Sequence, residues 1–156
     1  MNDMLYNYKV IDNEIVCRYK GITKHIVTPI ILNVNKSHYE YKAIWDTGAE
    51  RSCIFSDVIK PFNLQKVSTF NLRTVNRNEP VNTYFISISL KELGKISDNI
   101  EIIGLNRNTD IFDVIIGIDI INMGDFYFGI EDGCSIFKFR IPSRGIKNNI
   151  KFKKAW

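Results

Sequence analysis

The sequence predicts an all-β fold, a closed antiparallel β-barrel with one or two short helices. Isoleucine, valine, phenylalanine, tyrosine and threonine, which favour extended strands, are abundant along the whole chain. They occur in short stretches of alternating apolar and polar residues with turn-forming residues between them, a pattern typical of antiparallel strands. Because many short strands with few helices form a barrel or a sandwich, we expect the 156 residues to make one β-rich domain.

The first half of the chain is expected to contain six strands and one helix. Asp12-Asn13 separates two alternating stretches and therefore predicts a hairpin. Pro29 lies inside the third stretch and marks an edge or a bulge, because proline donates no backbone hydrogen bond. Ser56 is a good N-cap and Pro61 a good stop, which predicts a short helix over 56–60. The strands are expected at 5–10, 15–19, 24–34, 40–45, 52–55 and 68–75.

The second half continues the same pattern. The polar segment 76–80 is expected to be the tip of a long hairpin whose second strand is 81–90. The amphipathic stretch 118–123 predicts a second short helix, closed by Gly124. Asp132-Gly133 supplies the positive φ angles of a tight hairpin turn. The remaining strands are expected at 99–105, 114–116, 126–130 and 135–141.

Composition limits the classes of protein to consider. No apolar run approaches the roughly 18 residues of a membrane span, and the first residues do not resemble a secretory signal, so we expect no membrane partner. Cys17, Cys53 and Cys134 are widely spaced and form no Cys-x-x-Cys or Cys/His pattern. We therefore expect free thiols in a cytoplasmic protein, and no metal site.

Positive charge is concentrated at the C-terminal end. Seven of the 21 basic residues follow Asp132, and no acidic residue does. The functional interpretation of such a segment is a tail that binds nucleic acid, and the simpler one is a solvated strand edge with a frayed end. We favour the simpler one, because only Phe152 and Trp156 interleave with the terminal lysines.

Two motifs carry the chemistry. In the first, the apolar run 41–45 leads into Asp46-Thr47-Gly48, with Ala49 next and Ser52 soon after. Such a turn presents one carboxylate at the floor of a cleft, and its glycine lets other backbone approach closely. In the second, Val114-Ile115-Ile116-Gly117 precedes a short amphipathic stretch. Alone, Asp46 could be a turn residue that bonds its own backbone; the second motif favours a functional role.

Together these motifs resemble those of the retropepsin-like (retroviral-type) aspartic proteases. In that family an apolar pair precedes Asp-Thr/Ser-Gly-Ala, and a second apolar pair precedes Gly and a short helix. The stretch 124–143 looks especially like bacterial members. The resemblance covers residues 27–143, which we expect to be the protease domain. Residues 1–26 would then be an N-terminal hairpin extension and residues 144–156 a basic C-terminal tail.

The resemblance implies a role for each matching residue, with neither cofactor nor metal. Asp46, Thr47 and Gly48 would be catalytic, with the Thr47 hydroxyl bonding across a dimer. Ile116 and Gly117 would support the site from beneath. A flap formed by the hairpin tip would close over an extended peptide. The residues implied to contact substrate are Ala49, Glu50, Arg51, Val75, Asn76, Arg77 and Asn78.

The number of motifs predicts the assembly. Hydrolysis by carboxylates needs two of them about 3 Å apart that share one proton. The chain has a single Asp-Thr-Gly, so the second carboxylate must be Asp46 of another copy across a two-fold axis. The sequence thus predicts a homodimeric aspartic endopeptidase that binds peptides or proteins in extended form.

Two alternatives belong to other functional classes. A catalytically silent dimeric module could bind extended peptides in the same cleft, although a pure binder has no need of an acidic dyad. A nucleic-acid-binding β-barrel could use the basic tail, but this interpretation leaves both motifs unexplained.

Overall fold

The computed structural model of the chain describes residues 5–74, 76–107 and 109–145. Val75 and, from residue 146 onward, the predicted basic tail lie outside the described residues. No helix in the described part is both long and apolar enough to cross a membrane. The strands are β1 Leu5–Ile11, β2 Glu14–Tyr19, β3 Val27–Val34, β4 Ser37–Trp45, β5 Cys53–Phe55, β6 Thr69–Thr74, β7 Arg77–Leu90, β8 Gly94–Leu105, β9 Val114–Ile116, β10 Asp125–Glu131 and β11 Cys134–Arg140. The helices are α1 Ser56–Ile59, the 3₁₀ turn η1 Lys60–Phe62 and α2 Ile118–Ile121.

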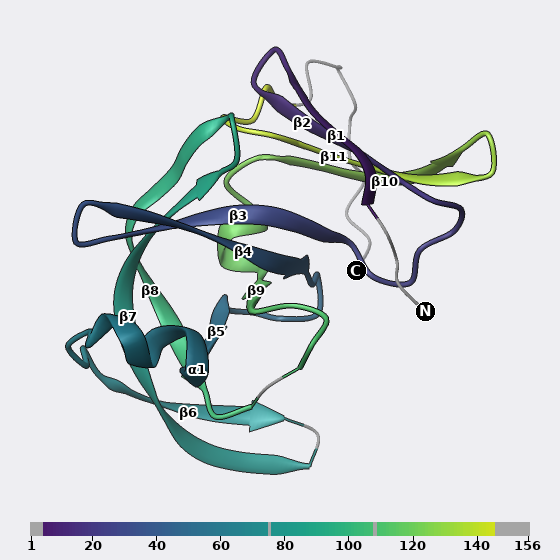
Figure 1. Cartoon of the computed structure of the whole chain (residues 1–156). Coiled ribbons are helices and arrows are strands. Elements are labelled where there is room, and N and C mark those ends of the chain that lie inside the picture. Colours follow the sequence, from purple (N-terminus) through teal and green to yellow (C-terminus); the bar gives the residue numbers. More distant parts are fainter. Residues whose placement is uncertain (1–4, 75, 108, 146–156) are drawn as a thin grey trace.

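The strands form two sheets (Figure 1). A four-stranded sheet has the order β1-β2-β11-β10, and a seven-stranded sheet has the order β3-β4-β9-β5-β8-β7-β6. An additional pairing of β3 with β7 joins the seven-stranded sheet back on itself, so that β6 alone lies outside the ring. The predicted N-terminal hairpin is β1–β2, and β2 pairs with β11 of the C-terminal hairpin. The division of the chain at residues 26 and 143 stays a prediction.

The strand-rich fold agrees with the prediction, but the purely antiparallel barrel is wrong. β9 runs parallel to β4 and antiparallel to β5, and β5 runs parallel to β8. The reason is that β9 inserts between β4 and β5, although these two strands are consecutive in the chain. A three-residue buried strand has no alternation that would distinguish parallel from antiparallel pairing.

An aromatic cluster joins the two sheets next to the first motif. Trp45, the last residue of β4, is buried, and its ring centroid lies 4.6 Å from that of Phe139 and 5.0 Å from that of Phe137, both on β11. The Trp45 indole N–H donates to Thr28 Oγ1 at 2.9 Å, so its polar atom is satisfied in the core. The end of β4 is therefore anchored on both sides of the interface between the sheets.

The hairpin β6–β7 differs from its predicted form. Thr74 pairs with Arg77 and Asn71 with Pro80, so the segment predicted as a polar tip is mostly strand, and of its residues only Asn76 lies in a turn. The segment 76–80 is polar because this part of β7 pairs only with β6 and is solvated, and its polarity was wrongly interpreted as a turn. Pro80 is tolerated there since one side of β7 lacks a neighbouring strand. In Figure 1 the hairpin lies at the end of the molecule opposite the four-stranded sheet.

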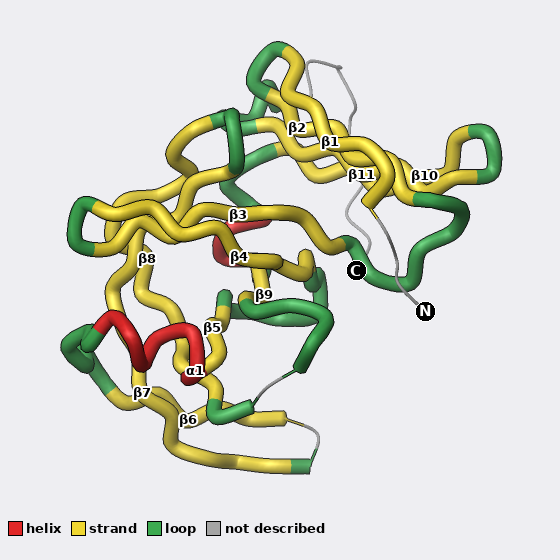
Figure 2. The backbone as a smooth tube through the Cα atoms, in the orientation of Figure 1, coloured by secondary structure: helices red, strands yellow, loops and turns green. Residues whose placement is uncertain are grey.

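The predicted first helix also differs at both ends. Phe55, not Ser56, occupies the N-cap position, and no side chain caps the helix. Beyond Ile59 the chain continues as the 3₁₀ turn η1 through Pro61, which sits in the first turn. Proline is accepted there because the first N–H groups of a helical turn have no internal partner. Figure 2 shows α1 and the turn after it as one helical segment, drawn in red.

Candidate active site

The loop 46–52 lies over the end of β9. Before the loop, β4 lies beside β9, with Trp45 paired to Ile116. After the loop, β5 lies on the other side of β9, with Cys53 paired to Ile115. The loop therefore crosses the carboxyl end of a buried strand, which brings the two sequence motifs together.

Asp46 is the first residue of this loop, and it is exposed. Its backbone N–H donates to the Ile116 carbonyl at 2.9 Å, which continues the pairing of β4 with β9 by one residue. The Gly48 N–H donates to Asp46 Oδ1 at 2.8 Å, and the Ala49 N–H donates to the Asp46 carbonyl at 3.2 Å. One carboxylate oxygen is thus oriented by the turn itself. Among the described residues no other group donates to this carboxylate.

Gly117 lies directly beneath the loop. A Cβ at this position would lie 2.7 Å from the Arg51 carbonyl carbon and 2.8 Å from the Ala49 carbonyl oxygen, so only glycine allows this approach. The Ile118 N–H donates to the Ala49 carbonyl at 2.8 Å. Ile116 is fully buried. Both residues predicted to support the site thus lie under the loop.

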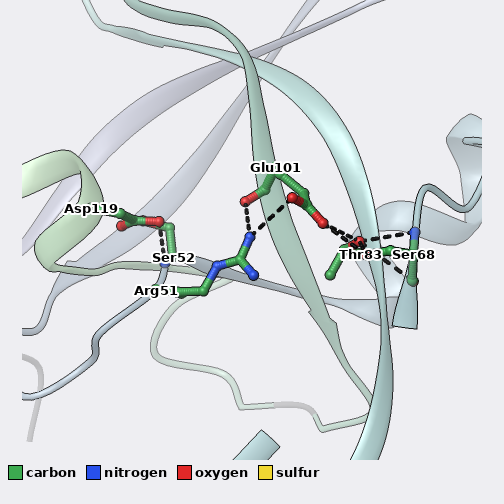
Figure 3. Close-up of polar contacts among 6 residues, drawn as sticks. All are labelled: Arg51, Ser52, Ser68, Thr83, Glu101 and Asp119. Carbon is green, nitrogen blue, oxygen red and sulfur yellow. Dashed lines mark hydrogen bonds and ion pairs between the residues drawn. The ribbon is translucent and has the colours of Figure 1, made fainter. Parts of the chain in front are cut away.

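Asp119 holds the far end of the loop, a role that sequence reasoning missed (Figure 3). The Ser52 hydroxyl donates to Asp119 Oδ1 at 2.6 Å and accepts the Gly117 N–H at 2.9 Å. The Ser52 N–H donates to Asp119 Oδ2 at 2.9 Å. Ser52 is fully buried, so these bonds fix its backbone. The sequence pattern that could have indicated this role is an aspartate in the first turn of α2, where backbone N–H groups need acceptors.

The other predicted residues of this loop differ in exposure. Thr47, Gly48 and Glu50 are exposed, and Ala49 is partly buried. Thr47 is thus available to a partner chain, and the loop presents Asp46, Thr47 and Glu50 on one exposed segment.

Arg51 contacts strand β8. Its Nη2 donates to the Glu101 carbonyl at 3.1 Å and lies 3.4 Å from Glu101 Oε2. Its guanidinium carbon lies 5.0 Å from the centre of the Phe70 ring on β6. Hydrogen bonds from Thr83 and Ser68, and then the Arg51 charge, lower the pKa of Glu101 below its ordinary value. Sequence reasoning missed Glu101, because no local pattern connects it with the loop.

The predicted flap residues are not brought to Asp46. Asn76 and Asn78 are exposed on the hairpin β6–β7, and none of the described contacts joins them to the loop. The side chain of Arg77 lies outside what the structure describes. No group of three histidine, cysteine, aspartate or glutamate side chains within the described ranges could hold a metal ion. Cys17 and Cys53 are buried free thiols, and Cys134 is a partly buried one.

Comparison with known proteins finds similarity in structure alone. No family model matches the sequence, and no curated protein does. A retropepsin-like aspartic protease from Rickettsia conorii superposes with a TM-score of 0.52 at 17% identity, over 86% of this chain and 97% of that one. The chain has a retropepsin-like fold.

Two further structures match this retropepsin-like chain more weakly. The Simian Foamy Virus (mac) protease superposes with a TM-score of 0.42 at 14% identity, over 61% of this chain and 92% of that one. A foamy viral protease-reverse transcriptase superposes with a TM-score of 0.41 at 20% identity, over 62% of this chain and 12% of that one.

Proposed function

We propose that this protein is an aspartic endopeptidase that acts as a homodimer. The observation that carries the proposal is the exposed Asp46 carboxylate, oriented by Gly48 on a loop that Gly117 and Asp119 support. Its place in a retropepsin-like fold supports the same chemistry. The sequence contains a single Asp-Thr-Gly motif, so in this proposal a second copy supplies the other carboxylate.

In the proposed reaction the two copies of Asp46 have different roles. The ionised Asp46 accepts a proton from a water molecule, and the water oxygen attacks the scissile carbonyl carbon. The protonated Asp46 of the second copy donates a hydrogen bond to the carbonyl oxygen and stabilises its developing charge. The C–N bond then breaks as the peptide nitrogen takes the proton that the first Asp46 received from water, which leaves a carboxylic acid and an amine and restores the dyad. The two carboxylates share one proton because like charges this close cannot both ionise.

The substrate is a peptide segment in extended form. In this proposal the peptide adds as a strand beside the loop 46–52, where Gly48 and Glu50 are exposed, and side-chain pockets set specificity. In this proposal the hairpin β6–β7 is the flap that closes over the peptide and excludes bulk water.

Asp46→Asn tests the proposed chemistry. Asparagine keeps the shape and can still accept the Gly48 N–H, but it cannot act as a base. We expect cleavage of denatured casein to fall by at least about 10³-fold, as for the loss of a general base. The matched control is Asp132→Asn, which changes an exposed aspartate at a hairpin turn.

The outcomes distinguish the candidate functions. Wild-type activity in Asp46→Asn contradicts the dyad mechanism. If the wild-type protein cleaves nothing, but both it and Asp46→Asn bind an extended peptide equally, the protein is a silent binding module.

A further inference from the structure

A polar cluster connects the loop that carries Asp46 with the base of the hairpin β6–β7 (Figure 3). We name it the Arg51–Glu101 cluster, and it consists of Arg51, Ser68, Thr83 and Glu101. Arg51 follows Asp46 in the loop 46–52, and Glu101 lies on β8. Ser68 and Thr83 lie where β6 and β7 begin to separate from the rest of the sheet, since β8 pairs with β7 only from Thr83 onward.

Glu101 uses both carboxylate oxygens within this cluster. Oε1 accepts the Thr83 hydroxyl at 2.6 Å and the Ser68 hydroxyl at 2.9 Å. Oε2 lies 3.4 Å from Arg51 Nη2. The two hydroxyls also contact each other at 2.7 Å. The carboxylate thus connects the hairpin base on one side with the guanidinium on the other.

Arg51 also contacts the hairpin directly. Its guanidinium lies over the ring of Phe70, which belongs to β6. A planar guanidinium that stacks on a ring and pairs with a carboxylate has few orientations left, and lysine does not reproduce this arrangement. The side chain is therefore fixed between the loop, β8 and the hairpin.

We propose that Arg51 and Glu101 are positioning residues that couple the hairpin β6–β7 to the loop carrying Asp46. Displacing the hairpin moves Ser68, Thr83 and Phe70, and the cluster passes that displacement to the backbone of Arg51. Ser52, the next residue, is bound to Asp119 and Gly117, so the displacement acts on the rest of the loop. The proposal rests on the proposed function, in which this hairpin closes over the substrate.

The cluster acts through geometry more than through charge. The side chains of Arg51 and Glu101 are 26% and 33% exposed, and an ion pair with that access to water adds little to stability. Thr83, in contrast, is fully buried, so the carboxylate is bound to a fixed hydroxyl.

Hydrogen exchange tests the coupling without relying on catalysis. In Glu101→Gln and in Arg51→Met we expect faster amide exchange at two separate places, the hairpin base around Ser68 and Thr83 and the loop 46–52. The control is Glu40→Gln, which breaks an exposed ion pair of similar kind, Glu40 Oε2 to Lys91 Nζ at 3.0 Å, outside the cluster. If the double variant exchanges no faster than either single variant, the two residues act as one unit.

Steady-state kinetics supply the second readout. We expect Glu101→Gln to raise KM about tenfold, a change of about 1.4 kcal/mol in binding, with a smaller change in kcat, because the hairpin binds substrate before chemistry. Ser68→Ala removes one hydroxyl from an exposed residue and should also raise KM, but by less than Glu101→Gln does. Arg51→Lys should not restore wild-type KM.

Three results would overturn the coupling. These are unchanged exchange in the loop 46–52 in both single variants, fully additive effects in the double variant, and a KM no different from that of Glu40→Gln. If the wild-type protein lacks peptidase activity, the proposed function fails, and hydrogen exchange alone then decides whether the cluster couples hairpin and loop.

Discussion

At the scale of single residues, the site depends on Gly117, which has no side chain, as much as on the Asp46 carboxylate. Gly117 allows the loop 46–52 to lie against the end of β9, with backbone atoms of Arg51 and Ala49 where a Cβ would stand. The polar supports, Ser52 and Asp119, bind the same loop from the α2 side. The loop that carries Asp46 is therefore held by residues beneath it and at its far end.

Gly117→Ala should displace this loop. The new methyl group would meet backbone, which cannot rotate away, so we expect a destabilisation of about 1–3 kcal/mol together with reduced peptidase activity. Urea unfolding monitored by circular dichroism measures the first effect. The comparison is Gly133→Asn, at a turn with open space and a left-handed φ that asparagine tolerates. Equal loss of stability in the two variants would contradict the steric explanation.

At the scale of elements, side chains connect β8 to β7 and to the residue before β6, in addition to the backbone ladder between β8 and β7. Glu101 on β8 accepts hydrogen bonds from Ser68 and Thr83, at the base of the hairpin. These bonds favour the ionised carboxylate and lower its pKa. Asp125 at the start of β10 has a lowered pKa for a similar reason, through the Ser143 hydroxyl and the Arg144 backbone N–H.

Stability should therefore depend on pH through Glu101. Because the pKa is lower in the folded state, the contribution is complete above the unfolded pKa, about 4.3, and is lost as pH falls through the folded pKa. We expect wild type to lose more stability than Glu101→Gln as the pH is lowered below about 4.3. Urea unfolding of both proteins between about pH 3 and pH 7 measures the difference, and the contribution of Asp125 cancels in it. Parallel curves would show that Glu101 adds no pH dependence.

At the scale of the whole molecule, the chain supplies one of the two carboxylates that the proposed chemistry needs. The described chain presents one exposed Asp46, and its neighbour Thr47 is exposed as well. An isologous dimer is the assembly that places a residue opposite its own copy.

Sedimentation equilibrium should show a homodimer of the wild-type protein. Asp46→Asn should still dimerise, whereas Thr47→Ala should weaken the dimer as well as activity, because it removes a hydroxyl proposed to bond across the axis. Full peptidase activity from a protein that stays monomeric at high micromolar concentration would refute the shared dyad. If the protein is an inactive monomer that dimerises only when a peptide is added, dimerisation depends on peptide binding.

Features that depend on neighbouring residues could be predicted from the sequence. Asp12-Asn13 and Asp132-Gly133 both have positive φ angles in the hairpins predicted around them. Val114–Ile116 is a strand with the predicted bounds, and Asp46-Thr47-Gly48 follows a strand as expected. Turn preferences and the alternation of apolar residues are local, so they can be read directly along the chain.

The contacts between distant segments could not be predicted from the sequence. The insertion of β9 between β4 and β5 places Gly117 beneath Arg51, and it brings Ser52 to Asp119, 67 positions along the chain. Glu101 reaches Arg51 across 50 positions in the same way. Such contacts follow from the pairing order and direction of short buried strands, and one sequence carries no local pattern that encodes them.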